Sequence, residues 1–489
     1  MTAKNIAEFN FSNFVRESLL LNTENNSRIW FTHLNLSNSK KNDFPDSGEI
    51  ADYLFSKIKS PELDFFLLLV DRKRNEKWTI TNNFVSYQEL IEIKIKGLKK
   101  QKKNTLHKRG CVWKKYLNRN ELQKLINRNP TTPIEAIAAS KKATIIQPNK
   151  PLRLGKINIQ KPWGFETWYT GVEKRGVVNV IDNNGKTELP YSLNIFKKQI
   201  LNNFPEELIL LKKLNPSSQE IIGDLYYEMH EKKWEVYIVT EIDKSVWPKG
   251  KAVIKAGLNP KKIFEYKNRH GKDWKIFLIK NFKKATNEYE KIRFEIDNSK
   301  KNISKQLFIQ ELKLRKKATN FVGDCYVQKG DVVSFPAYQI HCLQHGIKVI
   351  EFQTPHYERL IVMFGQKVVT QDSWDSEKAL NKMIPSVYKP PKIEKLYKTK
   401  GILLERIVNF PNFTSDRLFL DPKMIWKEKL EKKYHILIAI SGRATIENKF
   451  GENMSINIEE ALIIPISMGK YNIKNNGDVP LICLKAMPK

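Results

Sequence analysis

Cysteine is scarce in this sequence, and its spacing excludes two kinds of structure. Only four Cys occur among 489 residues, and none belongs to a Cys-x-x-Cys pair. A disulfide framework or a zinc ribbon needs closely spaced cysteines. We therefore exclude both and expect a protein of a reducing, cytoplasmic compartment. The four residues are Cys111, Cys325, Cys342 and Cys483.

Long apolar segments are also missing. The first residues, MTAKNIAEFNFSNF, lack the apolar core of a secretory signal. The longest apolar run in this part of the chain, residues 65–70, is far shorter than the roughly 18 residues that a membrane-spanning helix needs. We therefore expect a soluble protein with no membrane partner.

Acidic residues are few relative to basic ones. The chain has 85 Lys and Arg against 53 Asp and Glu, a formal net charge of +32 and a pI near 9.7. Such a balance commonly indicates nucleic acid or an anionic surface as partner. Here Lys is spread along the whole chain, and the basic run 99–109 has only Trp113 and Tyr116 beside it as aromatics. We interpret the charge as solvated surface lysine and expect no nucleic-acid partner.

The length of the chain predicts about three domains. Within residues 1–150, apolar positions recur three and four residues apart at 6–21 and 50–58, and Ser86 with Glu89 forms a capping box. This pattern predicts an α-helical N-terminal domain. No motif in it indicates a function or a partner.

After Gly155 the pattern changes to short apolar segments and turns, which predicts a mainly β protein. A charged segment with helical spacing interrupts it at about 259–320, and we interpret this segment as a helical insertion. The segment 372–399 contains Pro385, Pro390 and Pro391 and is interpreted as a linker, because Pro fits neither a central strand nor a helix interior. The strands then form one domain at 151–385 and a second at 400–489.

Residues 223–239, GDLYYEMHEKKWEVYIV, contain the residue types that bind metal ions. The pattern predicts two strands and a turn that carry Glu228, His230 and Glu235. Residues i and i+2 of a strand point to one face, so Glu228 and His230 project together. We expect the chain to turn after His230 and to bring Glu235 back beside them.

A second motif supplies a further histidine. Gly330 is followed by five residues, then Pro336, then His341, and the two motifs together have the layout of a cupin metal site. Imidazoles and carboxylates suit zinc, manganese or iron. The alternative is that these are ordinary strand residues beside lysines. Two ordered motifs, each with its own glycine turn, favour one divalent metal ion, with zinc preferred. The predicted ligands are Glu228, His230, Glu235 and His341.

From residue 155 to residue 489 the chain resembles the type I phosphomannose isomerases (mannose-6-phosphate isomerases), a family of metal-dependent cupins. The resemblance rests on both motifs above and on three further pieces, one of which, EFQTPHYERL at 351–360, looks like the family's Glu-Ile-Gln segment and its Tyr-Arg-Leu ending. The matching pieces are 161–166, 211–215, 223–239, 335–341 and 351–360.

This resemblance implies two cupin-type β-barrels, the second free of metal, and the interconversion of mannose 6-phosphate and fructose 6-phosphate. The four predicted ligands fall, in order, on the family's Gln, His, Glu and His. Arg359 and Lys212 fall on its functional arginine and lysine. The expected substrate-binding residues are Lys161, Trp163 and Glu351.

Some of these residues also have a purely structural interpretation. Trp163 can simply close the sheet, Arg359 can pair with Glu351 or Glu358 at the surface, and Lys213 is placed as well as Lys212 by sequence.

The chain departs from the family pattern at three points. Glu228 stands where the family has a neutral Gln, fewer residues separate His230 from Glu235, and Tyr338 stands where a glycine is usual. These departures keep two alternatives open: a non-catalytic metal-binding cupin that binds or senses a sugar derivative, and an oxygen-using manganese or iron cupin.

Overall fold

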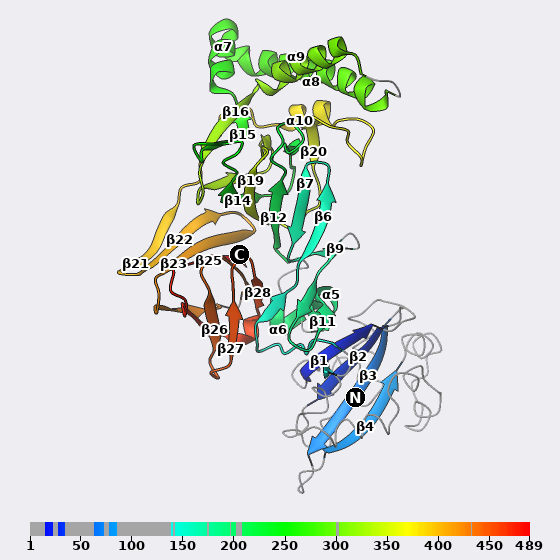
Figure 1. Cartoon of the computed structure of the whole chain (residues 1–489), viewed down its shortest axis with the longest axis vertical. Coiled ribbons are helices and arrows are strands. Elements are labelled where there is room, and N and C mark those ends of the chain that lie inside the picture. Colours follow the sequence, from blue (N-terminus) through cyan, green and yellow to red (C-terminus); the bar gives the residue numbers. More distant parts are fainter. Residues whose placement is uncertain are drawn as a thin grey trace, which may run out of the picture. The chain divides into compact units, whose positions relative to one another are not determined.

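The structure is a computed structural model, and it describes residues 15–22, 28–34, 63–72, 78–85, 138–139, 142–173, 176–195, 197–201, 208–299, 303–431 and 433–489. Contacts divide the chain into two compact units (Figure 1). Unit 1 comprises Met1–Gly155, Gly171–Pro205 and Leu420–Cys483, and unit 2 comprises Lys156–Thr170, Glu206–Phe419 and Leu484–Lys489. Each unit is thus built from three separate segments, whereas the domains predicted from the sequence are continuous, with boundaries near 150, 385 and 400.

The first described segments form a four-stranded sheet in the order β1-β2-β3-β4, in which only β2 and β3 are parallel. The predicted helix at 6–21 is therefore wrong from residue 15 onward. Short apolar runs have no reliable period, and tertiary pairing decides between helix and strand. The predicted helices at 50–58 and after Ser86, and the basic run 99–109, lie outside the described residues. The strands are β1 (Val15–Asn22), β2 (Arg28–Leu34), β3 (Leu63–Arg72) and β4 (Trp78–Val85).

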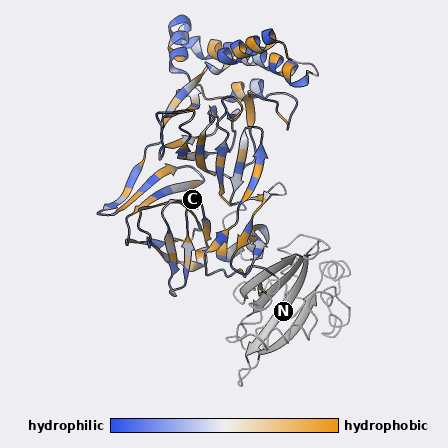
Figure 2. Cartoon of the chain, viewed as in Figure 1, coloured by the Kyte–Doolittle hydropathy of each residue, from blue (hydrophilic) through white to orange (hydrophobic). Residues whose placement is uncertain are grey.

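Unit 2 contains a cupin-type β-barrel made of two sheets. One sheet has the order β17-β14-β19-β12-β7-β6 and the other the order β16-β15-β18-β13-β20. Hydrophobic and hydrophilic residues are interspersed along these strands (Figure 2), and the buried ones, such as Tyr237, Phe335 and Ile254, form a core between the sheets. The predicted mainly β fold is confirmed. The strands are β6 (Ile157–Lys161), β7 (Gly164–Trp168), β12 (Leu210–Pro216), β13 (Tyr227–Met229), β14 (Glu235–Ile242), β15 (Ala252–Leu258), β16 (Val322–Val327), β17 (Val332–Phe335), β18 (His341–Cys342), β19 (Ile347–Gln353) and β20 (Leu360–Met363).

The helical insertion predicted at about 259–320 is confirmed. It consists of α7 (Pro260–His270), α8 (Trp274–Asn298) and α9 (Lys305–Thr319), with a 3-10 turn at Gly271–Asp273. Asn259 caps α7 by accepting a hydrogen bond from the Lys261 N–H, and Pro260 occupies the first helical position, where it is well tolerated. The buried face of α8 recurs every three or four residues and packs onto the barrel. This face comprises Leu278, Phe282, Ala285, Tyr289, Ile292 and Ile296.

The segment expected to be a linker contains regular structure. A short helix, α10 (Ser376–Lys382), packs against β20, and β21 (Glu394–Thr399) pairs antiparallel with β22 (Ile402–Asn409), which is followed by β23 (Phe413–Leu420). The prolines lie between these elements, which is where their missing N–H is tolerated.

Unit 1 contains the second cupin-type barrel, whose strands include the neighbours β11-β10-β5-β28-β25 of a longer sheet and the four-stranded sheet β24-β29-β26-β27. Its buried His435 lies 2.8 Å from the Tyr471 hydroxyl. No helix in the described part of the chain is long and apolar enough to cross a membrane. The remaining elements are β5 (Leu152–Leu154), β8 (Val172–Glu173), β9 (Gly176–Val177), β10 (Asn179–Ile181), β11 (Lys186–Glu188), α5 (Leu189–Ile195), α6 (Lys197–Leu201), β24 (Ile425–Lys429), β25 (His435–Ser441), β26 (Ala444–Asn448), β27 (Asn453–Ile456), β28 (Ala461–Ile464), β29 (Lys470–Lys474) and β30 (Leu481–Pro488).

Candidate metal centre

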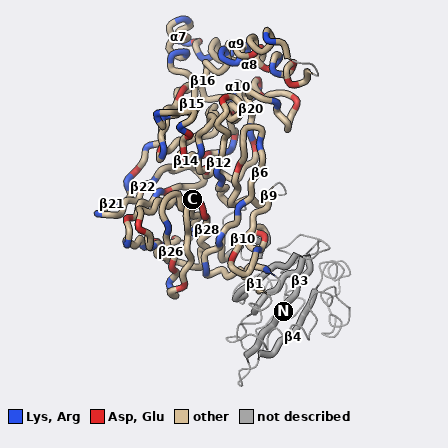
Figure 3. The backbone as a smooth tube through the Cα atoms, viewed as in Figure 1, with Lys and Arg blue, Asp and Glu red and all other residues tan. Residues whose placement is uncertain are grey.

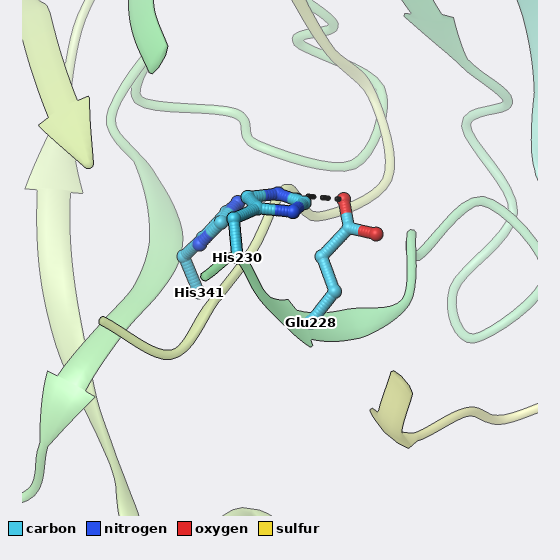
Figure 4. Close-up of side chains that lie close together, drawn as sticks. All are labelled: Glu228, His230 and His341. Carbon is cyan, nitrogen blue, oxygen red and sulfur yellow. Dashed lines mark ion pairs between the residues drawn. The ribbon is translucent and has the colours of Figure 1, made fainter. Parts of the chain in front are cut away.

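Three of the four predicted ligands meet inside the barrel of unit 2. Glu228 in β13 lies directly opposite His341 in β18, and His230 follows β13 immediately. One ligand atom from each of Glu228, His230 and His341 lies within 4.8 Å of the others, and the side chains point toward one another (Figure 4). This is a group that can hold a divalent metal ion.

The turns that present these side chains depend on unusual backbone positions. A Cβ on Gly223 would lie 2.0 Å from the Ser217 carbonyl oxygen, so only glycine fits there. Tyr338 adopts a left-handed φ of 65° where the sequence indicated a bend that favours glycine, which costs roughly 1 to 2 kcal/mol. Its N–H donates to the His230 carbonyl at 2.6 Å. The second motif is thereby tied directly to the first.

In each of the two imidazoles one nitrogen contacts a backbone carbonyl and the other faces the carboxylates of the site. The Nδ1 atom of His230 lies 2.9 Å from the Glu358 carbonyl oxygen, and Nδ1 of His341 lies 3.1 Å from that of Gln339. Because a carbonyl only accepts, a proton on each Nδ1 satisfies these two contacts and directs each Nε2 lone pair toward Glu235, where a metal ion would lie. A backbone carbonyl that orients a ligating histidine in this way is common at metal sites.

An unpartnered buried atom tests whether these residues fit a metal. Nε2 of His230 is buried and has no hydrogen-bond partner among the described residues. Burial, followed by the charge of Lys233, lowers the pKa of His230, which favours the neutral ring that binds metal. The residues therefore fit a divalent ion.

Glu235, the fourth predicted ligand, is the first residue of β14, and it contacts both histidines. Its carboxylate lies 3.4 Å from Nε2 of His230 and 3.1 Å from Nε2 of His341. The ammonium of Lys233 lies 2.6 Å from the same carboxylate. Burial alone would raise the pKa of Glu235, but Lys233 and then His230 outweigh it and hold that pKa well below its ordinary value.

The route by which Glu235 reaches the site differs from the expected turn between paired strands. β13 and β14 belong to the two different sheets of the barrel, and they do not pair with each other. Glu235 therefore approaches Glu228 and His230 from the other sheet. Local spacing does not encode which distant strand is the hydrogen-bonding partner.

A group of charged residues lies on β6, β7, β12 and β19 near the metal centre. Nζ of Lys212 donates to the Gln353 side chain at 3.0 Å and lies 3.7 Å from the Glu351 carboxylate. Burial raises the pKa of Glu351 well above its ordinary value, although Lys212 opposes the shift. Lys161 lies 3.6 Å from Glu166. Three of the predicted functional residues, Lys161, Lys212 and Glu351, thus belong to one polar wall.

The other two predicted residues have different surroundings. The Arg359 guanidinium lies 4.3 Å from the ring centre of Tyr226 and donates to the Thr370 hydroxyl at 3.0 Å. Trp163 is 1% exposed and packs in the barrel core, which favours the sheet-closing role for it. Gly164 beside it has a φ of 145°, and a Cβ there would lie 2.2 Å from the Asn215 carbonyl oxygen.

Lys233 is a residue of this site that the sequence motifs did not indicate. The signal that could have identified it is its spacing of two residues from Glu235, although β14 begins only at Glu235. Burial would lower the pKa of Lys233, but the carboxylates of Glu235 and Glu228 outweigh it and raise that pKa above its usual value. Lys233 therefore stays charged beside the metal centre.

Fold and site together define a cupin-type protein with a candidate divalent-metal centre. No protein-family model matches the sequence, and no curated protein matches it. Among solved structures it is similar to mannose 6-phosphate isomerase from Bacillus subtilis, with 14% identity over 68% of this chain and 99% of that chain, and a TM-score of 0.50. This likeness establishes a shared fold.

Two further structures have lower scores. A mutant of phosphomannose isomerase from Salmonella typhimurium has a TM-score of 0.49 and 11% identity, covering 69% of this chain and 99% of that one. A mannose 6-phosphate isomerase bound with zinc and yttrium gives the same four values.

Proposed function

We propose that this protein is a metal-dependent aldose–ketose isomerase that acts on a sugar phosphate and interconverts mannose 6-phosphate and fructose 6-phosphate. The observation that supports the proposal most is the convergence of two imidazole Nε2 atoms and two carboxylates beside the polar wall that contains Lys212 and Lys161. Glu228, His230, Glu235 and His341 would hold one divalent ion, for which zinc suits the donor set. The shared fold is consistent with this proposal.

The reaction moves a proton between adjacent carbons of the sugar. A base takes the proton from C2 of the aldose while O1 gains one, which forms an enediol. The proton then returns to C1 while O2 loses its own, which leaves the ketose. When bound, the ion would supply a Lewis acid for the sugar oxygens.

The residues of the chain would orient the substrate and balance its charge. Lys212, held by Gln353 and Glu351, is placed to transfer a proton or to bind the phosphate. Arg359, fixed over Tyr226, would offset negative charge on the enediol. Lys161 adds a second cation, which the extra carboxylate Glu228 makes necessary for an anionic substrate.

A second function, a metal-binding cupin without catalysis, is favoured by one contact. The 2.6 Å ion pair between Lys233 and Glu235 occupies part of a carboxylate that the isomerase proposal assigns to the metal. A protein that only binds a sugar derivative tolerates such competition, because it does not need a strong Lewis acid.

Metal analysis combined with an isomerase assay distinguishes these functions. The purified protein is analysed for bound metal and incubated with mannose 6-phosphate and, separately, with fructose 6-phosphate. One zinc ion per chain with turnover supports the isomerase, and zinc without turnover supports the binding protein. Iron or manganese with oxygen uptake would instead identify an oxygen-using cupin.

A further inference from the structure

The helical insertion carries a lysine-lined groove outside the metal centre. One face of α8 and Asn381 of α10 border an open hollow of about 660 Å³. Four lysines line it, and Figure 3 shows basic residues along these helices. We call this hollow the α8 groove. Its lysines are Lys280, Lys283, Lys284 and Lys291.

The groove residues follow one line along the helix. Positions 276, 280, 283, 287 and 291 are three or four residues apart, which places them on the face opposite the buried one. At a rise of about 1.5 Å per residue, the line from Lys280 to Lys291 spans about 16 Å. Positive charge therefore repeats along a linear path.

Most of this charge is uncompensated. Lys283 pairs with Glu377 at 2.6 Å, and Glu288, the one acidic residue of the lining, pairs with Lys317 at 2.5 Å. Among the described residues no carboxylate forms an ion pair with Lys280, Lys284 or Lys291. Residues 260–319 hold 18 Lys and Arg against 7 Asp and Glu, a larger excess than in the chain as a whole.

Exposed apolar side chains lie at both ends of the same face. Ile276 is 66% exposed and Phe294 is 57% exposed, and the 18 residues between them are five helical turns. A partner that binds only through its charge would leave the side chains of Ile276 and Phe294 exposed to solvent. A partner that also carries flat apolar faces would cover them.

We propose that the α8 groove binds single-stranded nucleic acid. Successive phosphates would meet Lys280, Lys284 and Lys291, and bases would cover Phe294 and Ile276. A bilayer surface is flat and broad and does not fill a hollow, so the groove favours a linear polymer over anionic lipid. The interpretation of all surface lysine as merely solvated then fails for this face.

The test measures binding of the full-length protein to fluorescently labelled 12-nucleotide oligouridylate and oligothymidylate by anisotropy, over a series of salt concentrations. Exchanging Lys280, Lys284 and Lys291 for Gln weakens binding at least tenfold at low salt. It also reduces the slope of log K against log salt by about 2, since each phosphate contact of a single strand contributes about 0.7. Metal content stays unchanged because these lysines lie outside the metal centre.

A matched variant removes the same charge elsewhere. Lys423, Lys427 and Lys470 are exposed lysines of unit 1, and their exchange for Gln is expected to leave the slope nearly unchanged. Equal losses in both variants, or no binding by the native protein, would overturn the proposal. Binding to phosphatidylserine vesicles through the same three lysines, without oligonucleotide binding, would also overturn it.

Discussion

Glu228 adds a second carboxylate to the candidate metal centre, in addition to Glu235. It lies 4.0 Å from Nε2 of His230 and opposite His341 in the sheet. In the resembled family a neutral Gln occupies this position. The choice between carboxylate and amide changes the charge of the site by one unit while keeping an oxygen ligand.

The substitution Glu228→Gln tests the effect of that charge. We expect one metal ion per chain to remain and the KM for mannose 6-phosphate to fall, because one anionic group no longer repels the phosphate. At a separation of about 8 Å the repulsion is about 0.5 to 2 kcal/mol, or roughly 2- to 30-fold in KM. Steady-state kinetics of both proteins provide the measurement. A higher KM in the variant would show that Glu228 binds substrate instead.

Among the strands, β7 begins at a position that only glycine can occupy without strain. Gly164 has a φ of 145° and lies against the Asn215 carbonyl of β12. We expect Gly164→Ala to destabilise the protein by at least about 2 kcal/mol in urea unfolding. Gly250→Ala is the control, because a Cβ there has open space and only the left-handed φ of 64° is unfavourable, at about 1 kcal/mol. Equal costs would contradict the close approach of β7 and β12.

The insertion is attached to the barrel through the buried face of α8. Phe282 is fully buried and stacks on Phe321 at 4.8 Å, whereas Phe264 of α7 is 66% exposed. We predict that Phe282→Ala costs about 3 to 5 kcal/mol of unfolding free energy. Phe264→Ala is expected to change it by less than about 0.5 kcal/mol. A small loss for Phe282→Ala would mean that the insertion does not pack on the barrel.

The insertion and the strands around the site show what local sequence can predict. The spacing of apolar residues in α8 and the Asn259-Pro260 start of α7 are local signals, and they located the insertion correctly. The pairing of Glu228 with His230 followed from strand alternation. In contrast, the strand β1 at 15–22 and the different sheets of β13 and β14 depend on distant partners, which no short pattern encodes.

At the scale of the whole molecule, binding of the predicted metal ion is expected to increase the free energy of unfolding. An ion that binds only the folded state at 100 times its Kd stabilises it by about 2.7 kcal/mol. We expect treatment with EDTA to lower the Tm of the native protein by roughly 3 to 5 °C, and added zinc to restore it, because the entropy of unfolding grows with chain length. The His341→Ala variant is expected to show no such shift. An unchanged Tm in the native protein would indicate that no stabilising ion was bound.

The interleaved segments of the two units explain why boundaries were harder to predict than elements. Strands β5, β10 and β11 come from residues 152–188, yet they share a sheet with β28, more than 270 residues later in sequence. The change in composition after Gly155 indicates where the strands begin in the sequence, but it does not indicate which of the two barrels each strand belongs to. The site was easier to predict because its ligands lie in two compact motifs.

The most direct test of the metal centre compares bound metal in the native protein with that in His230→Ala and His341→Ala. Inductively coupled plasma mass spectrometry is expected to find about one divalent ion per native chain and almost none in either variant. His270→Ala, which removes a histidine of the insertion, is the matched control and should keep its ion. Unchanged metal content in both His230→Ala and His341→Ala would contradict the metal centre and the isomerase proposal that depends on it.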